Sequence, residues 1–95
     1  LLHLVDATLD DPAEAYRIPN KGKILEGWDA DLTLVDIEHT RPVRNEETFT
    51  KVHWSPWNGR ELCGWPLYTI VNGEIAFDNG RIREQVRGRR LTYLP

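Results

Sequence analysis

The sequence contains no methionine, one cysteine, three histidines and no long apolar run. A single cysteine, Cys63, cannot form a disulfide within the chain, which suits a reducing compartment, so we expect a cytoplasmic protein. No apolar stretch approaches the ~18 residues that a transmembrane helix needs. The opening run Leu1–Val5 is too short for a signal-peptide core and lacks a basic lead-in. We therefore expect no membrane partner.

The absence of methionine extends to position 1, where the chain starts in an apolar run. An open reading frame begins with methionine, so we expect either a processed product or a piece of a longer protein. Removal of a signal peptide finds no support, because the chain has no Asn-x-Ser/Thr glycosylation signal and only one cysteine. The piece of a longer protein is the favoured expectation.

Clustered metal ligands are also missing from the sequence. Two histidines that share one ion usually lie four positions apart on a helix, or have a single residue between them on a strand. His3, His39 and His53 match neither spacing, so we expect three separate surface or loop histidines and no metal ligand, unless folding brings them together. Asp29 and Asp31 would lie on one side of an extended segment, as a cation site requires. Because they precede a strand, we favour a role in backbone hydrogen bonding.

Motifs for covalent catalysis are absent as well. There is no Gly-x-Ser-x-Gly turn around a nucleophile and no glycine-rich phosphate loop. Cys63 has only Arg60 and Glu61 as charged neighbours in sequence, which favours a small core residue over a reactive thiol. We expect no catalytic residue in this chain.

Charge is unevenly distributed around a net value of −3. Leu1–Glu38 holds nine acidic and three basic residues, whereas Arg81–Pro95 holds five arginines and one glutamate. Four of these arginines occupy odd positions, which is typical of the solvated face of an extended segment. Tyr93 is the only aromatic residue among them, whereas single-strand binders interleave several. We therefore expect no nucleic-acid partner.

The pattern predicts a mainly β chain with a short helix near its start. Asp10 or Asp11 can cap that helix, Pro12 suits its first position, and Pro19 ends it. Apolar residues on both faces of a strand at Asp31–Asp36 predict a central position in the sheet. Further strands are predicted at Lys23–Glu26, Trp65–Val71, Glu74–Phe77 and Arg81–Val86, with a possible helical turn at Asn45–Glu47, an aromatic loop at His53–Gly59, and turns at Asn72-Gly73 and Asn79-Gly80.

Two segments resemble a known superfamily. Gly22–Asp36 reads GKILEGWDADLTLVD and is similar to the D-A-D-L-x-L-x-D segment that follows the catalytic barrel of amidohydrolases. Trp54–Gly64 resembles the S-P-F-x-G-x-x-L-x-G loop of dihydroorotases and allantoinases, with Trp57 in place of the commoner Phe. The first segment indicates the superfamily only, and the second favours its cyclic-amidase branch, with dihydroorotase first.

Shorter matches flank these segments. Asp11-Pro12-Ala13 resembles the N-P-A that begins the last barrel-side helix. Gly64–Gly73 and Asp78–Gly80 match the strand and turn that end these proteins. Gly64-Trp-Pro also occurs in dihydropyrimidinase-like members, so allantoinase and dihydropyrimidinase-like proteins remain alternatives.

The resemblance implies part of the small composite β-sandwich domain that accompanies a (β/α)8 amidohydrolase barrel. Residues 1–19 would end the barrel-side helical segment, 20–86 would form the C-terminal half of the accessory β-domain, and 87–95 would be a surface tail. The parent protein would hold zinc in its barrel and interconvert dihydroorotate and N-carbamoyl-aspartate in pyrimidine synthesis. Its metal and catalytic motifs would all precede this segment, so no catalytic or metal residue and no cofactor is assigned to this chain, and its substrate-binding residues stay unidentified.

The expected partners are the barrel and the N-terminal strands of the parent protein. A half-domain without them would expose apolar faces, so we also expect self-association that buries Trp54, Trp57 or the strand at Leu32–Val35 between copies. Two other readings stay open: a standalone binding module that uses the Trp54–Trp65 region, and a parent that keeps the fold but has lost its metal ligands.

Overall fold

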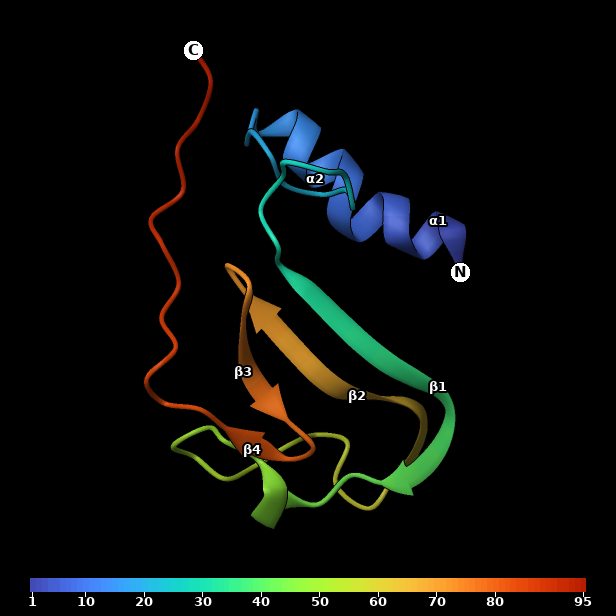
Figure 1. Ribbon diagram of the computed structural model, residues 1–95. Coiled ribbons are helices and arrows are strands. Elements are labelled where there is room, and N and C mark those ends of the chain that lie inside the picture. Colours follow the sequence, from blue (N-terminus) through green and yellow to red (C-terminus); the bar gives the residue numbers. More distant parts are fainter.

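The computed structural model describes all 95 residues and is mainly β, as predicted. A helical segment at the N-terminus precedes a four-stranded antiparallel sheet of order β1-β2-β3-β4, and an extended tail ends the chain (Figure 1). The elements are α1 (Leu2–Val5), a π-helical turn η1 (Asp6–Asp10), α2 (Asp11–Ala15), β1 (Leu32–Pro42), a 3-10 turn η2 (Asn45–Glu47), β2 (Glu61–Val71), β3 (Glu74–Asp78) and β4 (Arg81–Ile82).

The helical segment begins earlier than predicted. It runs without a break from Leu2 to Ala15, and Asp10 has helical torsion angles and makes no capping hydrogen bond. Pro12 therefore lies inside the segment and not at its start. Proline has no N–H to donate to the preceding turn and crowds the carbonyl there, and the chain accommodates it with the π-helical turn η1 directly before α2.

Two strand predictions were wrong in position. Lys23–Glu26 forms bends and a turn and no strand, because Gly22 and Gly27 on either side take positive φ angles of 94° and 84°. β1 lies at the edge of the sheet and not at its centre, since it pairs only with β2. Its apolar residues on both faces thus lack the cover on both sides that the pattern predicted.

The hairpin prediction was confirmed. Asn72 and Gly73 both have positive φ angles, 49° and 81°, as a two-residue hairpin turn between β2 and β3 requires. Asn79 and Gly80 repeat the arrangement between β3 and β4. The predicted last strand is shorter than expected, because β4 ends at Ile82. The turn at Asn45–Glu47 is confirmed as 3-10 helix.

The fold buries little of its surface. Ala13 alone is buried, and the accessible surface is 8116 Å², whereas a monomeric protein of 11.0 kDa is expected to expose about 5600 Å². The radius of gyration is 15.3 Å, against about 12 Å for a compact domain of this length. The sheet and the helical segment therefore do not close a core between them.

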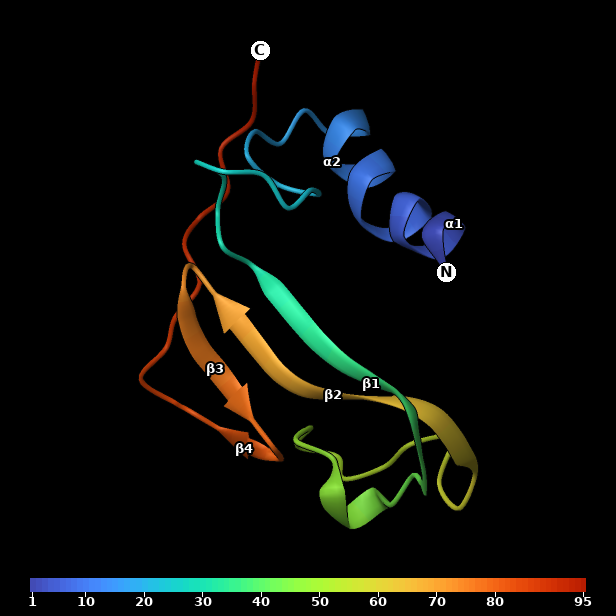
Figure 2. The same ribbon diagram turned by 45° about the vertical axis from the view of Figure 1, so that its right-hand side comes forward.

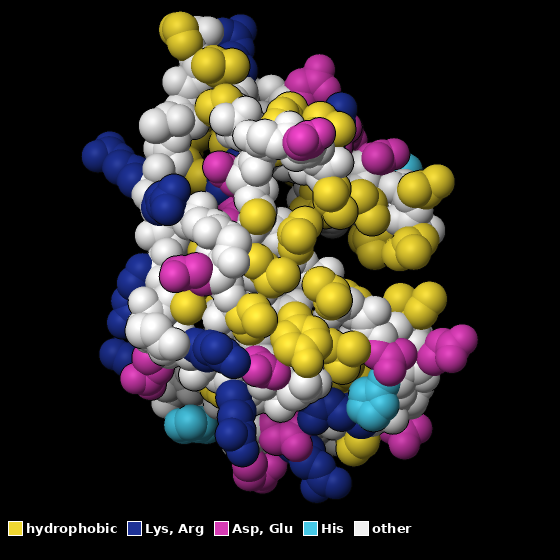
Figure 3. Space-filling view, in the orientation of Figure 1, with side chains coloured by type: hydrophobic (Ala, Val, Ile, Leu, Met, Phe, Trp, Pro, Cys, Tyr) yellow, Lys and Arg dark blue, Asp and Glu magenta, His cyan; other side chains and the backbone are white.

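The gap lies between the helical segment and the sheet. No part of Leu2–Ala15 packs against any strand, and the two are joined through the irregular segment that precedes β1 (Figure 2). Hydrophobic side chains gather on the helical segment and on the sheet below it, with a hollow between them (Figure 3). No helix is both long and apolar enough to cross a bilayer.

We predict that Gly22→Ala destabilises the chain by about 2–4 kcal/mol. A Cβ at Gly22 would lie 2.8 Å from the Leu9 carbonyl oxygen and 2.9 Å from the Ala13 Cβ, and the φ angle of 94° adds backbone strain. Gly27→Ala is the matched control, because its φ is similar and no atom lies within 4 Å of a new Cβ; it should cost only about 1 kcal/mol. Urea unfolding followed by tryptophan fluorescence, with an osmolyte to populate the folded state, would measure both. Equal losses would contradict the packing argument.

Candidate functional site

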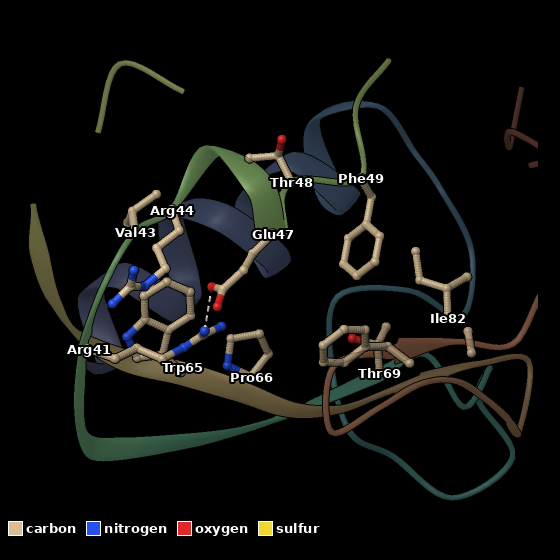
Figure 4. A pocket seen from close by; sticks show the side chains of 12 residues that line it. Arg41, Val43, Arg44, Glu47, Thr48, Phe49, Trp65, Pro66, Thr69 and Ile82 are labelled. Carbon is tan, nitrogen blue, oxygen red and sulfur yellow. Dashed lines mark hydrogen bonds and ion pairs between the residues drawn. The ribbon is translucent and has the colours of Figure 1, made fainter. Parts of the chain in front are cut away.

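An apolar pocket lies between the sheet and the segment that follows β1. It has a volume of about 530 Å³ and opens beside η2 (Figure 4). β2 and β3 form its floor, and Glu47, Thr48 and Phe49 overhang it. We call it the aromatic pocket; its lining is Arg41, Val43, Arg44, Glu47, Thr48, Phe49, Trp65, Pro66, Thr69, Ala76, Phe77 and Ile82.

One wall of the aromatic pocket is formed by the Arg41 guanidinium stacked on the Trp65 ring. The guanidinium carbon of Arg41 lies 3.8 Å from the ring centroid of Trp65, within range of a cation–π interaction. Its Nη1 donates to Glu47 Oε2 at 2.7 Å, and the Trp65 Nε1–H donates to the Leu62 carbonyl at 2.7 Å. These contacts join β1, η2 and β2 at one end of the pocket.

The opposite wall is aromatic. The rings of Phe49 and Phe77 meet edge to face, with centroids 6.3 Å apart and an angle of 82°. The one carboxylate in the lining, Glu47, is already engaged by Arg41, and no nucleophile with an adjacent base lines the space. This geometry suits the burial of apolar groups and offers no acid–base pair for catalysis.

A second cluster forms around the Asp29-Ala-Asp31 motif. The Lys21 ammonium contacts Asp31 Oδ2 and lies 3.0 Å from Asp29 Oδ2. The other oxygen of Asp31 accepts the backbone N–H of Asn72 at 2.7 Å, and the Gly73 N–H donates to the Ala30 carbonyl at 3.0 Å. We call Lys21, Asp29, Asp31 and Asn72 the Asp31 cluster. It ties the segment before β1 to the tip of the β2–β3 hairpin.

The contacts of the Asp31 cluster shift two pKa values. The hydrogen bond from Lys21, followed by that from the Asn72 N–H, lowers the pKa of Asp31. The hydrogen bond to Asp31, with a smaller one to Asp29, outweighs desolvation and raises the pKa of Lys21. Both carboxylates thus pair with Lys21, and Asp31 also accepts the backbone N–H of Asn72. Hydrogen bonding to the backbone is the structural role that the sequence favoured.

The tryptophan-rich loop is held by polar contacts at its base. The Asn45 Oδ1 accepts the Ser55 N–H at 2.9 Å, and the Asn58 Oδ1 accepts the Asn45 N–H at 2.8 Å. The rings at its tip remain largely uncovered, with Trp54 63% and Trp57 50% exposed. Within this chain the loop at His53–Gly59 therefore leaves both rings accessible.

The three histidines stay apart. His39 lies in an irregularity of β1 where its N–H donates to Asp36 Oδ1, and no group of three or more His, Cys, Asp or Glu side chains could hold a metal ion. The thiol of Cys63 contacts the Ile37 carbonyl at 3.1 Å and is exposed, not the core residue expected. The structure brings none of these groups into a common site.

The tail predicted at 87–95 runs back to Arg17, which follows the helical segment. The Leu94 N–H donates to the Arg17 carbonyl at 2.9 Å, and Arg17 Nη1 donates to the Pro95 carbonyl at 2.7 Å. The side chains along it are mostly exposed. The tail therefore lies along the segment between α2 and β1.

The aromatic pocket had no signal in the sequence. Arg41 and Trp65 are 24 positions apart, and Phe49 and Phe77 are 28 apart, so only strand pairing and the return of the η2 segment bring them together. The Asp31 cluster was signalled by the carboxylates of Asp29 and Asp31, but its lysine and its hairpin partner were not.

The fold of this chain matches part of a larger solved structure, the L-hydantoinase (dihydropyrimidinase) of Arthrobacter aurescens. The match covers 94% of this chain, with a TM-score of 0.84 and 28% sequence identity. In sequence it is 36% identical over 75 residues to the dihydroorotase of Methanothermobacter thermautotrophicus and 40% identical over 75 residues to that of Methanosphaera stadtmanae. No family model matches.

The chain is thus homologous to dihydroorotases and to hydantoinase/dihydropyrimidinase over a short region. It spans 17% and 18% of the two dihydroorotases and 20% of the hydantoinase. The resemblance to this group of proteins is confirmed, and so is the mainly β fold.

We predict that Asp31→Ala lowers stability by about 1–2 kcal/mol, because the Asn72 N–H loses its acceptor. Asp31→Asn should cost less than about 1 kcal/mol, since its amide oxygen can still accept that N–H and only the partly exposed ion pair with Lys21 is lost. Asp78→Ala, which removes an exposed pair with Arg83 at 2.9 Å, is the control and should change little. Equal losses of stability for Asp31→Ala and Asp31→Asn in urea unfolding would contradict the role of Asp31 as acceptor for the Asn72 N–H.

We also predict a pH dependence from the Asp31 cluster. The pKa of Asp31 is depressed in the folded chain, so its stabilisation is present above the ordinary value of 3.8 and is lost as pH falls through the lower, folded pKa. The pKa of Lys21 is raised, so its stabilisation is present below 10.5 and is lost as pH rises through the higher, folded pKa. Unfolding curves between pH 2 and 7 should show a smaller acid loss for Asp31→Asn than for the unchanged chain; the same acid loss in both would contradict the assignment.

Proposed function

We propose that this chain is the C-terminal part of the accessory β-domain of a dihydroorotase-like, metal-dependent cyclic amidohydrolase, and that its role in that enzyme is structural. The observation that carries the proposal is a match over 79% of the chain in sequence and 94% of it in structure, to about a fifth of such enzymes. The exposed apolar surface supports it, because a domain with one buried residue leaves room for further protein to cover it.

The zinc that the resemblance implies does not fit the residues of this chain. His3, His39 and His53 share no site, and Asp29 and Asp31 are occupied by Lys21. In this proposal the metal ligands and the catalytic groups belong to the barrel of the parent, and this chain contributes no step of the hydrolysis. The proposed location is the cytoplasm, in keeping with the single unpaired cysteine.

The chain would contribute support for the barrel. The Asp31 cluster joins the segment before β1 to the β2–β3 hairpin, and the stack of Arg41, Trp65 and Glu47 joins β1 to η2. In the parent, the barrel and the N-terminal strands would lie against the helical segment and the open edge of β1. These partners would fill the hollow between the helical segment and the sheet.

The proposed substrate of the parent is dihydroorotate, with hydrolysis to N-carbamoyl-aspartate in pyrimidine synthesis. The dihydroorotases among the relatives favour it, at up to 40% identity. A dihydropyrimidinase-like parent is the alternative favoured by the structural match, and an allantoinase by the loop at Trp54–Gly64.

A different class of function, a non-catalytic binding module, is favoured by one observation. Trp54 and Trp57 expose most or half of their surface on a loop whose base is rigidly hydrogen bonded. Exposed aromatic side chains on a fixed support are typical of protein-binding surfaces. Such a module would need no barrel, and a pseudoenzyme parent would need a barrel without metal ligands.

The test is the size and activity of the native protein. We expect mass spectrometry to find these 95 residues within a polypeptide about five times as long, and the purified native protein to hydrolyse dihydroorotate in a zinc-dependent reaction. The 95-residue chain alone is expected to show no turnover. A native polypeptide of 11.0 kDa would overturn the proposal, and a long parent that cleaves hydantoin or allantoin but not dihydroorotate would favour the alternatives.

A further inference from the structure

The segment that follows β4, residues 83–95, links the sheet to the helical segment a second time. We call it the C-terminal segment. At the sheet, the Arg83 N–H donates to the Ala76 carbonyl at 2.8 Å, and the Arg83 guanidinium contacts the Asp78 carboxylate at 2.9 Å. From there the segment runs past the tip of the β2–β3 hairpin toward the end of the helical segment (Figure 1). Its near end is thus attached to β3.

The far end of the C-terminal segment is attached at Arg17. The Leu94 N–H donates to the Arg17 carbonyl at 2.9 Å, and Arg17 Nη1 donates to the Pro95 carbonyl at 2.7 Å. Between Glu84 and Tyr93 no hydrogen bond or ion pair reaches the rest of the chain. The position of the far end therefore depends on one residue.

The backbone of Arg17 takes a conformation that arginine rarely adopts. Its φ is 53°, whereas the other non-glycine residues with positive φ are asparagines and one histidine, which tolerate it better. Arg17 ends the helical segment in a Schellman pattern, because its N–H donates to the Glu14 carbonyl at 3.0 Å and the Ile18 N–H donates to the Ala13 carbonyl at 2.9 Å. Glycine is the usual residue at this position, so ending the helix does not account for an arginine. The contacts of Arg17 with the C-terminal segment do account for it.

The C-terminal segment also carries charge opposite to that of the residues it crosses. Five arginines and one glutamate lie in Arg81–Pro95, whereas Leu1–Glu38 holds nine acidic and three basic residues. Residues 89–92 line a small polar cavity of about 110 Å³ together with three residues of the Asp31 cluster. After the hydrogen bonds from Lys21 and from the Asn72 N–H, the charge of Arg89 also lowers the pKa of Asp31. The basic end of the sequence thus has an acidic counterpart within the same chain.

We propose that the C-terminal segment is a strap that fixes the helical segment to the sheet. Arg17 binds its far end, and the charge of Arg89 holds its middle over the Asp31 cluster. The strap can detach without unfolding the sheet, because few contacts hold it and its side chains are mostly exposed. In the parent it would fix the accessory β-domain to the barrel-side helix, and that last step rests on the proposed function.

The test of Arg17 is hydrogen–deuterium exchange of the native protein, measured by mass spectrometry on a peptide that spans Leu91–Pro95. Leu94 has the one amide of this peptide that is hydrogen bonded, so we expect that amide to be protected. Arg17→Gly keeps the carbonyl acceptor and suits the positive φ but removes the guanidinium, and it should lower the protection of Leu94 roughly fivefold.

Asn20→Gly is the matched control for Arg17→Gly. Asn20 also has a positive φ, 59°, and makes no side-chain hydrogen bond, so the protection of Leu94 should not change. A role in ending the helix alone predicts that Arg17→Gly leaves the protection of Leu94 unchanged or raises it. That result, or an unprotected Leu94 amide in the unaltered protein, would overturn the strap.

Two further variants test the charge. Arg89→Gln should lower the protection of Leu94 roughly twofold and weaken the loss of protection that salt causes between about 0.05 and 0.5 M. Arg87→Gln is its control, since the Arg87 guanidinium contacts the carbonyls of Glu84 and Val86 within the strap itself; it should change both quantities little. Equal effects of the two variants would overturn the role of Arg89. Exchange at one amide is independent of turnover, so the strap and the proposed function can fail separately.

Discussion

The arrangement of this chain depends on the carboxylate of Asp31. One of its oxygens contacts the Lys21 ammonium and the other accepts the Asn72 N–H, so a single side chain joins the segment after the helix to the tip of the β2–β3 hairpin. Because no part of the helical segment packs on the sheet, few other contacts set their relation. Ionised carboxylates make stronger hydrogen bonds than neutral groups do, which suits Asp for such a junction.

The same junction explains why glycine stands at Gly22. The chain turns back toward the helical segment there so closely that a Cβ would meet the Leu9 carbonyl and Ala13. Lys23 then reaches Asp10 at 3.2 Å, and Asp29 donates its N–H to the Asn20 carbonyl at 3.2 Å. The residues of the D-A-D motif thus hold the connection between the helical segment and the sheet.

Burial is the second constraint. The aromatic pocket brings six aromatic or charged side chains together, yet the only buried residue lies in α2. Hydrophobic burial is the main favourable term in folding, and this chain obtains less of it than its size allows. In the proposed parent, the rest of the longer protein would cover this surface.

The sequence by itself determined the local features. Asn72-Gly73 and Asn79-Gly80 make hairpin turns because these residues accept positive φ, and alternating or continuous apolar residues make strands of β1, β2 and β3. It also carried the likeness to amidohydrolases in Gly22–Asp36 and the likeness to dihydroorotases in Trp54–Gly64. Only the tertiary structure decided that β1 is an edge strand, that Pro12 lies inside a helical segment, and that Arg41 meets Trp65 across 24 positions. Strand order and such contacts depend on which segments pair at a distance, and local propensity and periodicity carry no information about that.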